Sequence, residues 1–139
     1  MQQEWQAPTN DGIRNHSSSA SNQRIDRETK GTLDVVGHDP DRIRARLAEL
    51  DREWDIDRAL MLNFAVLGGL SASMTMRSIF RRRKLGGWGA LFITQMVFLG
   101  HHAVRRWCPP MPVFRRLGFR SDREINAERL ALLQRLGDQ

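Results

Sequence analysis

This chain of 139 residues has a single cysteine, an N-terminus without the pattern of a leader segment, and two long windows without charged residues. Its one cysteine, Cys108, excludes an intramolecular disulfide. The first residues, Met-Gln-Gln-Glu-Trp, contain no basic region followed by an apolar run. We therefore expect no cleaved signal peptide, and we expect the first apolar segment to direct targeting.

Two stretches of the chain are free of charge. Residues 59–76 hold no Asp, Glu, Lys or Arg over 18 positions, and residues 85–104 hold none over 20. A helix needs about 20 apolar residues to cross a hydrocarbon core of roughly 30 Å. The first window can lengthen to Phe80, because the long stem of Arg77 can reach toward the headgroups. Although the mean hydropathy is −0.51, the windows predict two transmembrane helices, 59–80 and 85–107.

The net charge of +6 suggests an anionic membrane surface or nucleic acid as a partner. Residues 77–84 and residues 105–120 each carry +5, so the positive charge gathers at the two ends of the second window. This placement favours anchoring on anionic lipids. A soluble, basic, helical nucleic-acid-binding protein is the weaker alternative, because the run 81–84 lacks interleaved aromatics. The side chains expected to contact lipid headgroups are Arg81, Arg82, Arg83, Lys84, Arg105 and Arg106.

The segments outside the windows are predicted from composition and capping. Residues 1–38 are polar, with apolar residues too scattered for a core, so we expect a disordered tail with at most a short transient helix near residues 25–30. Asp39 and Pro40 suit the start of an amphipathic helix over 40–57, which either lies at the interface or packs on its own protein. A capping box at Ser121 begins a second amphipathic helix over 122–136. The fold class is therefore an all-α membrane protein with a two-helix hairpin, and its ordered domain covers 39–136.

Small and polar residues within the windows are candidates for helix packing. Gly68, Gly69 and Ser73 make one stretch of the first window small, which lets helices approach closely in lipid. We expect them to face a helix partner, either within the hairpin or in a second copy of the chain.

Buried polar groups in lipid need partners. Asn63 lies at the depth of the adjacent His101 and His102 in an antiparallel hairpin, so we expect a hydrogen bond between Asn63 and one of them. Gln95 lies one heptad before His102 and can serve the same purpose within a dimer. Adjacent histidines point about 100° apart on a helix, so we expect no metal and no cofactor.

Two segments resemble a known family. Residues 51–58 read Asp-Arg-Glu-Trp-Asp-Ile-Asp-Arg, and residues 107–125 begin Trp-Cys-Pro-Pro-Met-Pro. Together they resemble the bacterial YgaP-like inner-membrane domain family, whose function is unknown. The resemblance covers 39–136 and implies two transmembrane helices followed by a Cys-Pro motif. Some members are fused to a rhodanese, which this chain lacks. The motif positions it implies here are Cys108, Pro109, Leu117 and Gly118.

From these features we expect a small, multi-pass inner-membrane protein that is not an enzyme. Its predicted role is that of a scaffold or accessory subunit, either self-associating or attached to a membrane complex. The alternative is thiol-dependent sulfur or redox handling through Cys108, whose neighbours are basic. The regions flanking the hairpin hold 11 Lys and Arg and the connecting loop holds 5, so we expect cytoplasmic termini.

Overall fold

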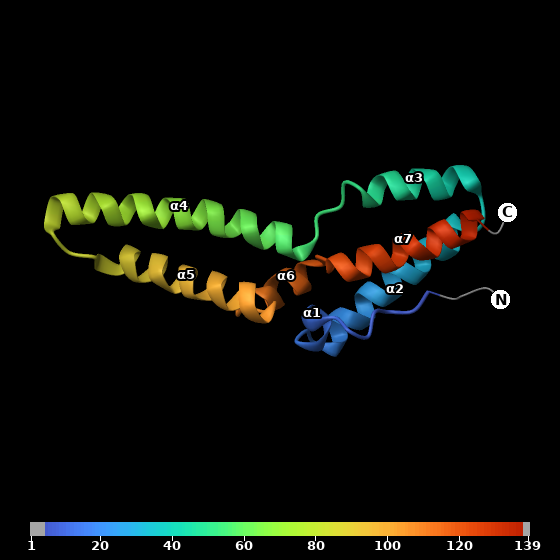
Figure 1. The fold of residues 1–139 in the computed structure, drawn as a ribbon, viewed down its shortest axis with the longest axis horizontal. Coiled ribbons are helices and arrows are strands. Elements are labelled where there is room, and N and C mark those ends of the chain that lie inside the picture. The colour runs from blue at the N-terminus through green and yellow to red at the C-terminus, as the bar shows by residue number, and fades with distance from the viewer. Residues whose placement is uncertain (1–4, 138–139) are drawn as a thin grey trace.

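The computed structural model describes residues 5–137, and all regular structure within them is helical (Figure 1). The described helices are α1 (Gly12–Asn15), α2 (Ser19–Val36), α3 (Pro40–Leu50), α4 (Ile56–Arg82), α5 (Gly86–Arg105), α6 (Met111–Leu117) and α7 (Asp122–Gly137).

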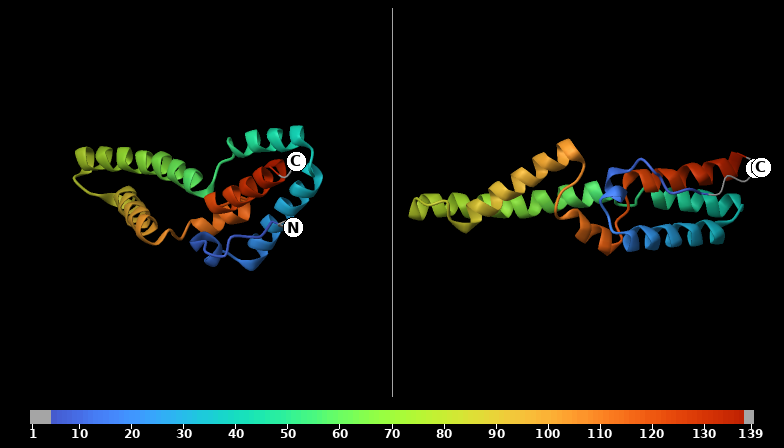
Figure 2. Two further views of the ribbon diagram at one scale, coloured as in Figure 1. Left: turned by 45° about the vertical axis from the view of Figure 1, so that its right-hand side comes forward. Right: turned by 90° about the horizontal axis from the view of Figure 1, so that it is seen from below.

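The molecule is elongated and has two parts. Helices α4 and α5 lie antiparallel as a long hairpin that projects from one end of the molecule (Figure 1). Helices α2, α3 and α7 lie side by side as a bundle at the other end, as the two further views in Figure 2 show. Helices α1 and α6 lie where the two parts meet, and both ends of the described chain lie on the bundle side (Figure 1).

The prediction of a disordered tail over residues 1–38 is wrong for the described part of that segment. Ser18 caps α2 by accepting a hydrogen bond from the Ser21 N–H at 3.2 Å. Ile25, Thr29 and Leu33 then follow at intervals of four residues, and all three side chains are buried. The serine-rich tract is therefore a helix start, and the sparse apolar residues make one narrow stripe. Residues 1–4 lie outside the described residues.

The bundle has its own apolar core, to which the N-terminal segment contributes. Trp5, from the N-terminal segment, is 6% exposed. Burial of such side chains is the main favourable contribution to folding. The core is formed by Trp5, Leu33, Val36, Ile43, Leu50, Ile125 and Leu132.

The helix predicted over 40–57 is shorter in the structure. Asp39 caps it and Pro40 occupies its first turn, as predicted, but α3 ends at Leu50. Asp55 caps a new helix by accepting from the Arg58 N–H at 2.6 Å, so the chain must leave the helix before it. Trp54 therefore lies in the connection, 41% exposed, with the Arg58 guanidinium 4.7 Å from its ring centroid.

The other predicted helices are present with shifted ends. Helices α4 and α5 replace the predicted 59–80 and 85–107. Arg83 ends α4 in the left-handed region at φ 52°, and Arg106 ends α5 at φ 53°. Helix α7 matches the predicted 122–136 closely, and the capping box is confirmed by mutual bonds between Ser121 and Glu124 at 2.8 and 3.1 Å. Helix α6 was not predicted from the sequence. It begins directly after the Pro109–Pro110 pair that ends the preceding segment.

A second apolar core joins the hairpin to the bundle. It contains Ile56, Leu60 and Phe64 from the first three turns of α4. The Ile56 N–H also donates to the Arg120 carbonyl at 2.9 Å, which ties the start of α4 to the α6–α7 connection. The fully buried Cys108 belongs to this junction core together with Met111 and Ile13. The base of the hairpin is thus fixed on three sides, whereas its remaining length projects freely.

Among the described helices, one is both long and apolar enough to cross a membrane. The qualifying segment is Ile56–Arg81. Within its apolar window, 28% of the residues are buried inside the protein. Helix α5 holds no Asp, Glu, Lys or Arg before Arg105, but it is not among the described segments that qualify.

Candidate functional site at the base of the hairpin

The interior of the hairpin contains a small polar contact. The Gln95 amide donates to the Ser71 hydroxyl at 3.4 Å, and both side chains are buried. A Cβ added at Gly68 would lie 3.6 Å from the Gln95 Oε1. Gly68 therefore faces α5, at the distance of an ordinary van der Waals contact with the glutamine. The contact that Gln95 makes in the structure lies within the chain, and its role in a dimer stays a prediction.

The predicted bond between Asn63 and a histidine is absent from the described residues. His102 instead faces the first turn of α4, where its Nε2 lies 3.2 Å from the Asp57 Oδ1. His101 Nδ1 lies 2.8 Å from the Trp107 carbonyl oxygen. Asn63 is only half-buried. Because α4 begins at Ile56, before the charge-free window, Asp57 lies in its first turn and is the side chain that His102 faces.

Gly69 and Ser73 point away from α5. A Cβ at Gly69 would meet nothing within 4 Å, and Ser73 is exposed with its hydroxyl bonded to the Gly69 carbonyl at 2.8 Å. Of the predicted packing face, only Gly68 contacts the neighbouring helix. Gly69 and Ser73 are left one turn apart on an outer surface.

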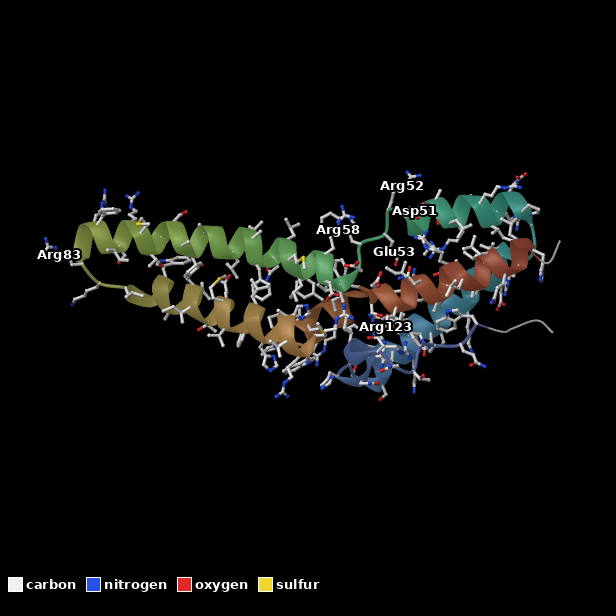
Figure 3. All side chains as sticks on the ribbon, in the orientation of Figure 1. Asp51, Arg52, Glu53, Arg58, Arg83 and Arg123 are labelled. Atoms are coloured by element: carbon white, nitrogen blue, oxygen red, sulfur yellow. The ribbon has the colours of Figure 1, made fainter. Side chains whose placement is uncertain are left out.

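The predicted headgroup-contacting residues lie at the two ends of the hairpin. Arg81 and Arg83 lie at the tip with Lys84, and Arg105 and Arg106 lie at the base; all five are exposed. Figure 3 shows Arg83 at the far end of α4. Arg82 belongs to α4, and its side chain lies outside the described residues. No acidic residue occurs between Asp57 and Asp122, so the hairpin supplies no carboxylate to these bases beyond its first turn.

Cys108 is 0% exposed and lies beneath Trp107 and Met111 in the junction core. Burial raises the pKa of its thiol, because removal from water disfavours the thiolate, and the Asp57 charge acts in the same direction. A backbone hydrogen bond involving Met111 opposes the shift. The basic neighbours Arg105 and Arg106 therefore do not produce the activated thiolate that their sequence positions suggest.

Beneath the hairpin lies a buried network of ion pairs that the sequence analysis missed. Glu124, 0% exposed, accepts from Arg115 at 2.6 and 2.9 Å and from Arg14 at 2.5 Å. Glu128, also 0% exposed, accepts from Arg120 at 2.5 Å and from Arg46 at 2.8 Å. The two carboxylates lie one turn apart on α7, and their partners come from four other segments. Helical spacing could have indicated their burial, since Glu124 and Glu128 lie on the same face of the predicted helix as the apolar Ile125 and Leu132.

The network links the N-terminal segment to the rest of the protein. Arg14 also pairs with Asp26 at 2.8 Å, and the Ser121 hydroxyl donates to Asp11 through a short contact. Asp11 itself is 2% exposed and caps α1 by accepting from the Ile13 N–H at 2.9 Å. A charged segment that looked disordered in the sequence is therefore ordered by specific polar contacts.

A polar pocket of about 170 Å³ opens between α1, the start of α4 and the start of α7. Its lining includes Asp55 and Asp57 from α4, Arg106 from the end of α5 and Arg123 from α7. Figure 3 shows Arg123 where the hairpin meets the bundle. The pocket carries both signs of charge and adjoins the His102–Asp57 pair.

The accessible side chains of the site are of types that bind charged ligands. Within residues 5–137, no group of three or more His, Cys, Asp or Glu side chains is placed to hold a metal ion. The one thiol is buried and its pKa is raised. The groups that remain accessible are carboxylates and guanidinium groups, which recognise charged ligands through hydrogen bonds.

No protein-family model, no curated protein and no solved structure matches this chain.

Proposed function

We propose that the protein is a small integral membrane protein whose α4–α5 hairpin crosses the bilayer, and whose bundle serves as a non-enzymatic scaffold or accessory subunit. The observation that carries the proposal is the outward apolar surface of the hairpin, next to a bundle whose surface is charged. Large apolar side chains on both hairpin helices are exposed, including Met61, Leu62, Val66, Leu70, Met76, Ile93 and Val97. A contiguous surface of this kind in water favours aggregation or association, and in lipid it is the natural exterior.

The dimensions of the hairpin support the proposal. At a rise of about 1.5 Å per residue, the 20 residues of α5 extend roughly 30 Å, which is the thickness of a hydrocarbon core. The 27 residues of α4 extend roughly 40 Å, enough to enter both headgroup regions. Trp54 and Trp107 lie at one end and Trp88 lies near the other, as expected for side chains that favour the interface.

Three hydroxyl side chains of α4 also suit lipid. The hydroxyls of Ser71, Ser73 and Thr75 bond to backbone carbonyls of α4 at 3.1, 2.8 and 2.7 Å. Hydroxyls that are satisfied within their own helix do not expose unpaired donors to hydrocarbon. Between the two helices, the Gln95 amide N–H donates to the Ser71 hydroxyl, whereas the Gln95 Oε1 has no partner among the described residues.

The charge distribution supports a membrane location over a nucleic-acid partner. Many bundle arginines already pair with carboxylates, such as Arg46 with Glu128 and Arg129 with Asp51. Bases without such pairs lie at both ends of the hairpin, where anionic headgroups would lie. We propose the bacterial inner membrane, with both termini cytoplasmic, as the setting. The Trp107–Cys108–Pro109 element after the second helix supports kinship with the YgaP-like family.

The geometry does not favour the thiol-dependent alternative. Cys108 is enclosed in the junction core, and the raised pKa of its thiol keeps it protonated near neutral pH. Its packing contacts give it a structural role at the point where the hairpin meets the bundle.

Three valines with similar exposure provide a direct test. Val35 in the bundle is 72% exposed, and Val66 and Val97 in the hairpin are 65% and 62% exposed. Each is replaced by cysteine in a Cys108→Ala background, and intact cells or inverted vesicles are treated with a membrane-impermeant maleimide. We expect labelling of Val35→Cys on one side of the membrane and no labelling of the other two, because lipid covers them.

Two results would contradict the transmembrane proposal. Labelling of all three cysteines at similar rates in unbroken membranes would mean that water reaches the hairpin, and the transmembrane proposal would fail. Release of the unaltered protein into the supernatant by an alkaline wash would contradict the proposal independently. Labelling after detergent extraction shows that each cysteine is reactive when lipid is removed.

A further inference from the structure

If the hairpin crosses the bilayer as proposed, the polar pocket at its base lies at a defined depth in the membrane. It is lined by residues that immediately precede or follow the two hairpin helices: Asp55 and Asp57 at the start of α4, and Arg106 just after α5. If the hairpin spans the bilayer, this level is that of the phospholipid headgroups on the bundle side. The pocket therefore opens where headgroups are the most concentrated polar ligands.

The two arginines of the pocket differ from many arginines of the bundle. Within residues 5–137, Arg106 and Arg123 form no ion pair within 4.0 Å and no side-chain hydrogen bond, although carboxylates line the same pocket. By contrast, Arg14, Arg115 and Arg120 are each held by carboxylates at 2.5–2.6 Å. Guanidinium groups bind phosphate well, through paired N–H donors.

The carboxylates of the pocket retain free acceptor capacity. Asp57 Oδ1 is enclosed by protein and lies 3.2 Å from His102 Nε2, so its other oxygen, Oδ2, is the one available to a ligand in the pocket. Asp55 uses one oxygen on the Arg58 N–H. A carboxylate accepts up to about four hydrogen bonds. Because acidic residues outnumber basic ones in the lining, the pocket disfavours a ligand with net negative charge.

We infer that this pocket binds the headgroup of a zwitterionic phospholipid with a primary ammonium, that is, phosphoethanolamine on a diacylglycerol. The phosphate lies against Arg106 and Arg123, and the ammonium donates hydrogen bonds to Asp55 and Asp57. A trimethylated ammonium has no N–H to donate, so the carboxylates discriminate against phosphocholine. A single water needs roughly 10–15 Å³, so a pocket of about 170 Å³ has room for this headgroup. The inference rests on the proposed membrane location.

The test uses the full chain purified in detergent and native mass spectrometry with added lipid. Phosphatidylethanolamine, phosphatidylcholine and phosphatidylglycerol with identical acyl chains are compared, together with soluble phosphoethanolamine. We expect the ethanolamine lipid to bind about tenfold more tightly than either other lipid, on the scale of one charge-assisted hydrogen bond. We expect Arg123→Gln and Asp55→Asn to remove that preference. Arg116→Gln, an exposed base on α6 outside the pocket lining, is the matched control and should keep it.

Equal binding of the three lipids, or a preference that survives Arg123→Gln, would overturn the inference. Soluble phosphoethanolamine that binds as tightly as the lipid would identify a free metabolite as the ligand and overturn the lipid assignment. Asp55 caps α4, so Asp55→Asn is interpreted only alongside Arg123→Gln, whose side chain makes no contact that holds the fold. Failure of the transmembrane proposal is recognised separately, through cysteine labelling and alkaline extraction, neither of which depends on lipid selectivity.

Discussion

Replacement of Glu124 by glutamine tests the central element of the bundle. Glu124 is fully buried and accepts hydrogen bonds from Arg115, from Arg14 and from the Ser121 N–H at 2.8 Å. Arg115 has a side chain that is 1% exposed. Glutamine keeps the shape but removes the charge, so Arg115 is left buried without a counter-ion.

The expected loss is large on the scale of protein stability. Removing one partner of a buried ion pair costs about 3–5 kcal/mol, because the remaining charge stays desolvated. Folding free energies of single domains are about 5–15 kcal/mol. The second substitution Arg115→Met should recover part of the loss, since it removes the stranded charge while Arg14 keeps its pair with Asp26 at 2.8 Å. Asp41→Asn is the control, because the Arg44–Asp41 pair is exposed and contributes little.

Pulse proteolysis in urea with the protein in micelles measures the midpoint of bundle unfolding. With a urea dependence of about 1–3 kcal/mol per molar, the Glu124→Gln midpoint should fall by roughly 2 M, and the Asp41→Asn midpoint should not move. A fall of the same small size in both variants would refute the argument, because Glu124 would then behave as a surface charge. A double variant no better than Glu124→Gln would show that the stranded Arg115 charge is not the cause.

The same carboxylate predicts a pH dependence. Burial alone would raise the pKa of Glu124, but the hydrogen bond and charge of Arg115, the Ser121 N–H and Arg14 outweigh burial and lower it below its usual value. The stability that follows is fully present above the pKa of an unfolded glutamate and is lost as the pH falls through the lower folded pKa. Acid should therefore destabilise the bundle of the wild type, and the part due to Glu124 should be missing from Glu124→Gln.

Three further predictions concern the hairpin, the thiol and the orientation. Gly68→Leu should loosen the hairpin, because a Cβ there would already be in van der Waals contact with Gln95 Oε1 at 3.6 Å, and the rest of the leucine side chain has to displace the glutamine. Gly69→Leu should leave the hairpin intact and weaken self-association, because a Cβ there meets nothing within 4 Å. Protease sensitivity and sedimentation separate the two effects, and identical behaviour would mean that neither face is specific. The thiol of Cys108 should react with a small maleimide near neutral pH only after unfolding, and rapid labelling of the folded protein would favour the redox alternative. A reporter active only in the periplasm should stay silent when fused to the C-terminus, and strong activity there would reverse the proposed orientation.

The sequence predicts the helices whose signals are local. Asp39 and Pro40 begin α3, and the Ser121–Glu124 capping box begins α7, because a cap depends on residues three positions apart. The charge-free windows likewise locate α4 and α5. The start of α4 moves outward by a few residues, since Asp55 can cap a helix that extends beyond the apolar stretch.

The parts that escaped prediction depend on contacts between distant segments. Arg14 meets Glu124 across 110 positions, and Arg46 meets Glu128 across 82. No pattern within one segment specifies such pairs, so the N-terminal residues looked like a solvated tail. The same reason explains the missed Asp57–His102 pair, which forms only once the register between α4 and α5 is fixed.

The ion pairs of the bundle bear on the proposed orientation. In the folded protein Arg46, Arg115 and Arg120 are held by carboxylates, so fewer free bases remain on the bundle side than the sequence count suggests. Orientation, however, is decided during insertion, before the bundle has formed. At that stage Asp and Glu contribute little, and the 11 basic residues flanking the hairpin count in full against the 5 in the loop. We therefore expect the flanks to stay in the cytoplasm and the ion pairs to form there afterwards, so that substitutions that break the bundle, such as Glu124→Gln, lower stability without reversing topology.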